Sequence, residues 1–112
     1  MKKVEAVVRP DMVGEIKAAL SSEGYPSMTI TDVRGRGKQE GVKQTWRGEE
    51  YQVDTLNKTK IEIVVPSEDV ETVVATISES ARTGDIGDGK IFVTPVEKAV
   101  RIRTGEEDGD AL

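Results

Sequence analysis

Hydrophobic and polar residues alternate along four short stretches of the chain, and two stretches with helical spacing lie between them. The alternation predicts β-strands over Lys3–Arg9, Met28–Val33, Thr59–Val65 and Ile91–Val96. The predicted order is therefore strand, helix, strand, long loop, strand, helix, strand. This order is typical of one ferredoxin-like α+β domain, a βαββαβ unit with a four-stranded antiparallel sheet and both helices on one face.

Both predicted helices follow a proline and carry apolar residues at helical spacing. The first has Asp11 as its N-cap and runs to about Glu23, before Gly24, and the second has Ser67 as its N-cap. The second helix has a continuous apolar stripe, which we assign to the core: Val70, Val73, Val74, Ile77 and Ala81. The helices cover one sheet face, and the other face also has apolar positions, so we expect a partner subunit there.

The segment 37–55 is a long polar loop between the second and third predicted strands. Loops longer than about 12–15 residues are uncommon in compact domains and are usually functional or disordered. This one has the only Trp of the chain, Trp46, and one of its two tyrosines, Tyr51. Aromatic residues on a loop favour a docking surface over a disordered insertion, which is the alternative.

Composition excludes several classes of chemistry. The 112 residues include no Cys and no His, so disulfides, thiol chemistry, a His general base and the usual transition-metal ligands are excluded. The net charge of −5 disfavours nonspecific binding to nucleic acid. No apolar run approaches the length of a membrane span, and the N-terminus leads directly into a predicted strand. We therefore expect a cytoplasmic protein that neither binds nucleic acid nor inserts into a membrane.

A second glycine-rich loop, 82–90, is a candidate anion site. Its backbone N–H groups could form a nest for phosphate, with Lys90 as a point charge. Ile91 follows Lys90 and a strand follows the loop, so this is not a Walker motif. Arg101 and Arg103 lie in a predicted short edge segment, on one side of it, and could add forked donors. The alternative is a tight turn with two solvated arginines.

Lys38 and Lys58 flank the long loop and form a second candidate site. With backbone amides near Gly37 and Gln39, these two cations could hold a small dicarboxylate if the loop folds back. Ordinary surface lysines are the alternative, and composition favours it.

Three stretches resemble the PII nitrogen-regulatory signal transduction proteins. They are Gly35–Gly41 leading to Trp46–Tyr51, then Lys58–Val65, and finally Thr83–Val93 followed by Val100–Glu106. The resemblance covers essentially the whole chain without gaps. It names the long loop 37–55 the T-loop, the loop 82–90 the B-loop, and 99–112 a C-terminal segment and tail.

The resemblance implies a homotrimer with nucleotide sites in the clefts between subunits. ATP or ADP would be bound by Met28, Thr29, Gly35, Gly37, Lys38, Gln39, Glu62, Val64, Gly87, Asp88, Gly89, Lys90, Arg101 and Arg103. The arginines would come from a neighbouring chain or complete the cleft of their own chain. The effector 2-oxoglutarate would lie beside MgATP, contacting Gly37, Lys38, Gln39, Gly41 and Lys58. Gln39 would help to coordinate Mg²⁺, and Lys58 would pair with the distal carboxylate.

The resemblance further implies a sensor without enzymatic activity, which controls an ammonium transporter or glutamine synthetase through the T-loop. Tyr51 matches a position that is uridylylated in some bacterial members. Lys38 and Trp46 depart from the Arg and Tyr that are common in the family. The alternatives from other classes are an enzyme acting on ATP, an adenylate sensor without a 2-oxoglutarate response, an RNA-binding module and a metal-handling trimer.

Overall fold

The computed structural model describes residues 1–36, 42–46, 49–53 and 55–112. Its strands and helices are β1 (Lys2–Val8), α1 (Val13–Ser22), β2 (Thr29–Gly35), β3 (Val42–Trp46), β4 (Glu49–Val53), β5 (Leu56–Val65), α2 (Val70–Ala81) and β6 (Gly89–Pro95). Short 3₁₀ turns precede both helices, η1 (Pro10–Met12) and η2 (Ser67–Asp69), and a third, η3 (Asp108–Ala111), lies near the C-terminus.

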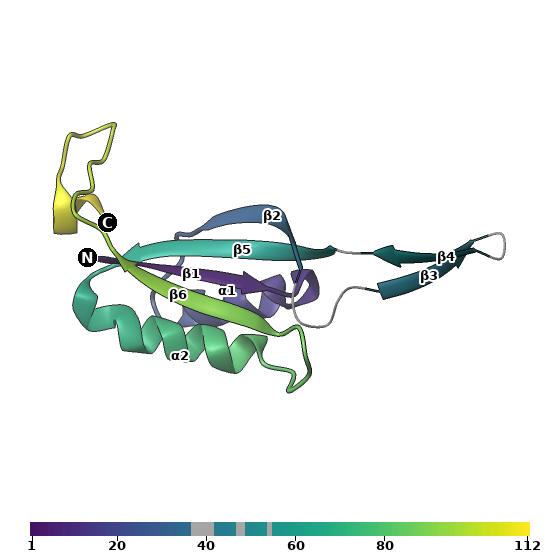
Figure 1. Ribbon diagram of the computed structural model, residues 1–112. Helices are drawn as coiled ribbons and strands as arrows, with labels where there is room; N and C mark the ends of the chain where they lie inside the picture. The colour runs from purple at the N-terminus through teal and green to yellow at the C-terminus, as the bar shows by residue number, and fades with distance from the viewer. Residues whose placement is uncertain (37–41, 47–48, 54) are drawn as a thin grey trace.

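The main sheet has four antiparallel strands in the order β2-β5-β1-β6, and both helices pack against one of its faces (Figure 1). This arrangement confirms the predicted ferredoxin-like α+β fold. The longest strand, β5, lies between β1 and β2 and reaches toward the β3–β4 pair. The loop 82–88, which leads from α2 into β6, lies at that same end of the sheet.

The hydrophobic core lies between the helices and the two central strands. Side chains alternate across a strand, so every second residue of β1 and β5 points toward the helices. The fully or nearly fully buried apolar residues are Val4, Ala6, Val8, Ile16, Leu20, Ile61, Ile63, Val65, Val73, Ile77 and Ala81. The stripe predicted for the second helix is confirmed, since Val70 and Val74 pack partly buried against this core.

Both predicted helix starts were early, by one residue for α1, whose N-cap is Met12, and by two for α2, whose N-cap is Asp69. Pro10 and Pro66 fix an extended approach and are followed by a 3₁₀ turn before the α-helix begins. Asp11 therefore lies within η1 and does not cap α1. Ser67 opens η2 instead of capping α2, and its hydroxyl accepts a hydrogen bond from the N-terminal amine at 3.2 Å. The predicted end at Gly24 is confirmed, because Gly24 follows α1 with φ of +93°.

The long segment between β2 and β5 contains a second, two-stranded sheet that the sequence did not predict. Strands β3 and β4 pair antiparallel, with Val42 opposite Val53 and Trp46 opposite Glu49. On either side of this pair, β2 continues to Gly35 and β5 begins at Leu56, which is earlier than the predicted start at Thr59.

Val100 to Arg103 were predicted as a short edge segment of the sheet, and that prediction was wrong. Val100 forms only an isolated bridge, with Glu107, and Arg101 to Arg103 lie in turns beyond β6. Val100 and Ile102 imitate the alternation of a strand, but Ile102 is 98% exposed and has no sheet to pack on. The residues after Val100 fold back on themselves instead of extending the sheet.

Candidate functional site

The carboxylate of Asp88 closes the loop 82–88. It accepts hydrogen bonds from the backbone N–H of Thr83 at 2.8 Å and of Gly84 at 2.9 Å, and from the Thr83 hydroxyl. Arg9 Nε donates a fourth, at 3.1 Å. These donors hold the pKa of Asp88 below its usual value, the Thr83 hydroxyl first and the Gly84 N–H next. Asp88 therefore acts as an ionised brace inside the loop.

Two cationic side chains attach this loop to the sheet. Arg9, the residue after β1, also donates from Nη2 to the carbonyl oxygen of Ile86 at 2.6 Å. Lys58 of β5 donates from Nζ to the carbonyl oxygen of Gly87, also at 2.6 Å. The loop is thus held by the ends of two central strands. Arg9 was missed as a site residue, because its partners lie 77 and 79 positions away and no local pattern marks them.

Two glycines allow the close approach of the loop to these strands. Gly87 and Gly89 have φ of +101° and +107°, in the region that favours glycine. A Cβ at Gly89 would collide with the carbonyl oxygen of Val7, and one at Gly87 would lie 3.3 Å from Arg9 Nη2. Gly89 and Lys90 belong to β6, so the loop ends earlier than the predicted boundary at residue 90.

Cations gather on the open sheet face, opposite the helices, at the end beside this loop. Lys90 pairs in register with Val7, and Val7 with Lys60, so the three side chains share that face. Lys58 precedes buried Thr59 and lies on the same face. Lys60 is neutralised by Glu62 at 3.4 Å and by Glu5 at 3.8 Å. Among the side chains that the structure describes, Lys58 and Lys90 form no ion pair.

The predicted contacts to adenine and ribose lie toward the other end of the sheet. Thr29 and Glu62 are opposite each other in the β2–β5 register, and Val64 follows on the same face. Met28 packs partly buried against the core. From Lys58 to Val64 the face extends about 20 Å, at about 3.4 Å per residue. The structure therefore places Thr29, Glu62 and Val64 on the same face as the cations but apart from the loop 82–88, whereas Met28 lies on the core side.

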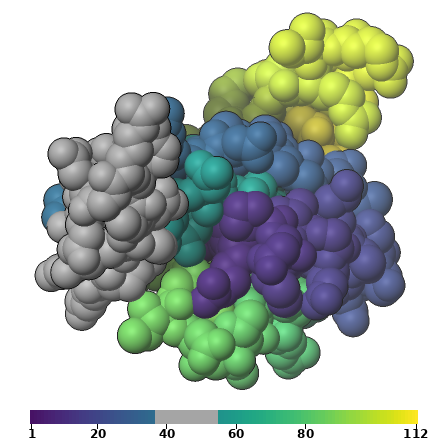
Figure 2. Space-filling model, turned by 90° about the vertical axis from the view of Figure 1, so that its right-hand side faces the viewer, coloured from purple at the N-terminus to yellow at the C-terminus, as the bar shows by residue number. Residues whose placement is uncertain are grey.

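Arg101 and Arg103 lie beyond the far end of β6, whereas Gly87 to Lys90 lie before or at its start. Figure 2 looks onto the end of the sheet with the green loop, and the yellow C-terminal segment lies away from it. Within one chain the arginines thus do not complete a site with the loop 82–88. Arg101 is instead bound by Glu106, with Nη1 and Oε1 separated by 3.3 Å.

Several predicted residues fall outside the part of the chain that the structure describes: Gly37, Lys38, Gln39 and Gly41. The side chain of Tyr51 is likewise not described. Gly35, the last residue of β2, lies beside Lys58: a Cβ at Gly35 would be 3.4 Å from the Cγ of Lys58. The same lysine is bonded to the loop 82–88.

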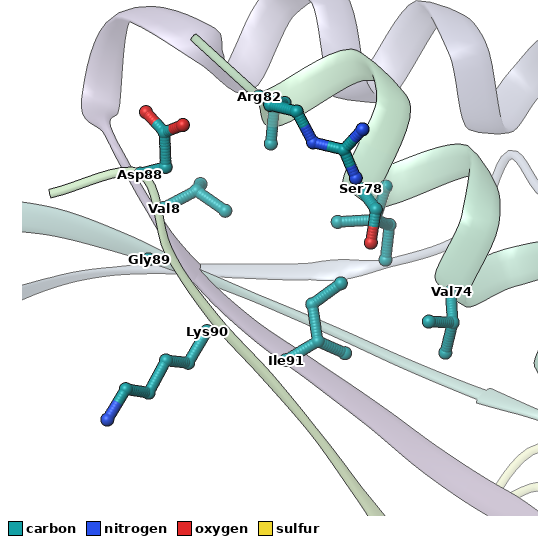
Figure 3. Close-up of a pocket in the computed structure, with 10 residues that line it drawn as sticks. Val8, Val74, Ser78, Arg82, Asp88, Gly89, Lys90 and Ile91 are labelled. Atoms are coloured by element: carbon teal, nitrogen blue, oxygen red, sulfur yellow. The ribbon is translucent and has the colours of Figure 1, made fainter. Parts of the chain in front are cut away.

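A hollow of about 290 Å³ lies between α2 and β6, next to the loop. Its floor is apolar, with Val74 and Ile91 facing each other, and Arg82 lies at its edge (Figure 3). Lys90 points away from this floor in Figure 3. The hollow therefore lies on the helix-covered face, although Lys90 also contributes to its lining.

The described residues contain no group of three or more Asp or Glu side chains that could hold a metal ion. The same residues include no helix long and apolar enough to cross a membrane.

Comparisons with known proteins bear on the whole chain. The family model described as nitrogen regulatory protein P-II matches residues 1–106. The chain is 55% identical over 112 residues to nitrogen regulatory protein P-II 2 of Methanothermobacter thermautotrophicus, covering 100% of this chain and 97% of that protein. It is 53% identical to the nitrogen regulatory proteins P-II of Haemophilus influenzae and of Synechocystis, with all of each chain covered. The chain has a ferredoxin-like fold and belongs to the nitrogen regulatory protein P-II family. This confirms the resemblance seen in the sequence.

Proposed function

We propose that this chain is a nitrogen regulatory signal protein that binds ATP or ADP together with 2-oxoglutarate. It acts without catalysing a reaction, and it controls a target such as an ammonium transporter or glutamine synthetase through the segment 37–55. Its family membership and the regulatory names of its relatives support this class. The observation that carries the ligand assignment is the convergence of Arg9, Lys58 and Lys90 around the loop 82–88, in a protein of net charge −5.

The proposed phosphate site uses the backbone of Gly87 to Lys90, with the side chain of Lys90 as a point charge. Asp88 shapes this site instead of binding phosphate, because its carboxylate is negative and is bonded to Thr83, Gly84 and Arg9. Adenine and ribose then lie along the open face, toward Met28, Thr29, Glu62 and Val64. In this proposal Mg²⁺ accompanies ATP and is held with the help of Gln39.

The position of the two arginines supports the proposed homotrimer. Because Arg101 and Arg103 lie at the far end of β6, they can serve a phosphate site only on a neighbouring chain. The open face also offers apolar surface to such a neighbour, since Phe92 is 52% exposed and lies on it. A shared site would make nucleotide binding depend on assembly.

The proposed role of Lys58 links the effector to the nucleotide. Its ammonium group donates to the Gly87 carbonyl at 2.6 Å. Pairing with the distal carboxylate of 2-oxoglutarate would draw this group away from Gly87, and so change the anchoring of the loop 82–88. A ligand shifts a conformation only through such a difference in contacts between two states.

Calorimetric titration tests the proposal. ATP, ADP and 2-oxoglutarate are titrated with and without Mg²⁺, and sedimentation gives the mass of the assembly. We expect a trimer in which 2-oxoglutarate binds with MgATP and not with ADP. Nucleotide binding without any response to 2-oxoglutarate would leave an adenylate sensor. No nucleotide binding under any condition would refute the ligand assignment.

A further inference from the structure

The backbone after β6 brings Arg101 and Glu106 face to face. The N–H of Arg101 donates to the carbonyl of Glu106 at 2.8 Å, and the N–H of Gly105 donates to the carbonyl of Arg101 at 2.7 Å. Val100 and Glu107 form a bridge just outside this turn. Gly105 has φ of +74°, which lets the chain reverse there. The two side chains are therefore neighbours because the backbone closes the turn.

The guanidinium of Arg101 is engaged by its own chain on both terminal nitrogens. Nη1 lies 3.3 Å from Glu106 Oε1, and Nη2 donates to the backbone oxygen of Leu112 at 3.2 Å. Arg103 differs, since it is exposed and forms no ion pair with the side chains that the structure describes. The two arginines assigned to one nucleotide site are thus in different states.

We infer that Glu106 is an internal competitor for the phosphate at Arg101 and lowers the nucleotide affinity of the site. The inference rests on the proposed function, which assigns Arg101 to a bound nucleotide. The planar fork of a guanidinium binds carboxylate and phosphate by the same donors. An incoming phosphate must displace the Glu106 carboxylate and then remains near its negative charge.

Exposure limits the size of this effect. The side chains of Arg101 and Glu106 are 40% and 44% exposed, so water and salt screen their attraction. Exposed pairs of this kind are weak, which corresponds to a change in affinity of about two- to fivefold. A weaker site also releases its nucleotide faster, because affinity differences of this kind lie mostly in the dissociation rate.

The chain provides a matched control one residue away. Glu107 also pairs with a cation, Lys98, at 3.1 Å, and its side chain is 58% exposed. Glu106→Gln and Glu107→Gln remove the same charge and leave the backbone hydrogen bonds of the turn in place. Only the first removes the carboxylate that faces Arg101. Any general effect of net charge on nucleotide binding is therefore common to both variants.

The experiment titrates ATP and ADP into wild type, E106Q and E107Q by calorimetry, at low and at high salt, after thermal melts have shown all three to be folded. We expect E106Q to bind ATP about two- to fivefold more tightly than E107Q at low salt, with the difference shrinking as salt rises. E106D, which retains the charge, should stay close to wild type.

Equal or weaker binding by E106Q relative to E107Q would overturn the inference and leave the proposed function intact. If none of the proteins binds a nucleotide, the proposed function fails, and the inference fails with it. Should E106Q not fold, Glu106→Ala would provide the comparison, with Glu107→Ala as its control. Equal ATP affinity in these two variants would overturn the inference.

Discussion

The ammonium group of Lys58 donates a hydrogen bond to the carbonyl oxygen of Gly87 at 2.6 Å, across 29 positions of sequence. This bond joins β5 to the loop 82–88, and the Cγ of the same lysine lies 3.4 Å from where a Cβ of Gly35 would be. Lys58 therefore lies beside the end of β2, where the predicted T-loop begins, and is bonded to the second loop.

Lys58→Met should abolish the response to 2-oxoglutarate while leaving the fold intact. The variant loses one partly buried hydrogen bond from a charged donor, worth about 1.5–3 kcal/mol, so its urea midpoint should fall while the protein still folds. Titration of 2-oxoglutarate in the presence of MgATP measures the response. Lys17→Met, at an exposed position of α1, removes the same charge and should bind as wild type. Normal 2-oxoglutarate binding by Lys58→Met would contradict the role given to this lysine.

Asp88→Asn should flatten the acid side of the stability profile. The folded-state pKa of Asp88 is lower than its unfolded value, so the folded protein binds fewer protons between the two values. The stabilisation is therefore present above the unfolded pKa of about 4 and is lost as the pH falls toward the folded one. Urea denaturation from neutral to acidic pH should show a smaller loss for Asp88→Asn than for wild type. Asp85→Asn, in the same loop, should follow wild type, and equal profiles for all three would refute this account.

Arg9→Met should loosen the loop 82–88 without unfolding the sheet. The variant loses the bonds to the Ile86 carbonyl and the Asp88 carboxylate. Asp88 accepts hydrogen bonds from the N–H groups of Thr83 and Gly84, so these two groups should be less protected from hydrogen exchange. Hydrogen exchange measured by NMR should be faster at these two amides and unchanged at β5.

Arg9→Lys should fall between wild type and Arg9→Met, since a lysine keeps the charge but lacks the fork that reaches two acceptors. Identical exchange in wild type and Arg9→Met would show that Asp88 and Lys58 alone hold the loop.

Gly89→Ala should destabilise the protein more than Gly84→Ala does. Both glycines have positive φ, +107° and +93°, so both variants incur backbone strain of about 1–2 kcal/mol. A methyl group at Gly84 meets no atom within 4 Å, whereas at Gly89 it collides with the Val7 carbonyl. The difference between the two free energies of unfolding isolates the steric part. Equal losses would mean that β6 shifts to relieve the collision.

The core was predicted well from the sequence, because the residues that one face of a strand or helix buries recur at the period of that element. The alternation at Val4, Ala6 and Val8 and the helical spacing of Val73 and Ile77 each follow from one face meeting the core. The helix starts were missed because a capping residue after proline is compatible with either an α-helix or a 3₁₀ turn.

The site was less accessible to sequence reasoning, because its contacts are long-range. Glycines and cations marked the loop 82–88, but nothing near Arg9 pointed to Asp88 or Ile86, and Lys58 was not expected on the Gly87 carbonyl. At the C-terminus, Val100 and Ile102 have the period of a strand, although Gly105 turns the chain back on itself. The local pattern cannot distinguish a strand from such a turn, because a strand also needs a neighbouring strand to pair with.

The turn that joins Arg101 to Glu106 has a mechanical consequence. Its bonds, including those from Ala99 to Asp108 and from Arg101 to Leu112, all close within the C-terminal segment, over at most 11 positions. The last hydrogen bond to the sheet side is that of the Val96 N–H with the Met1 carbonyl, at 3.1 Å. The segment from Lys98 onward is therefore held together by its own bonds, and Val96 marks the end of its backbone attachment to the sheet. In the proposed trimer, this segment would bring Arg101 and Arg103 to a neighbouring chain without any strand leaving the sheet.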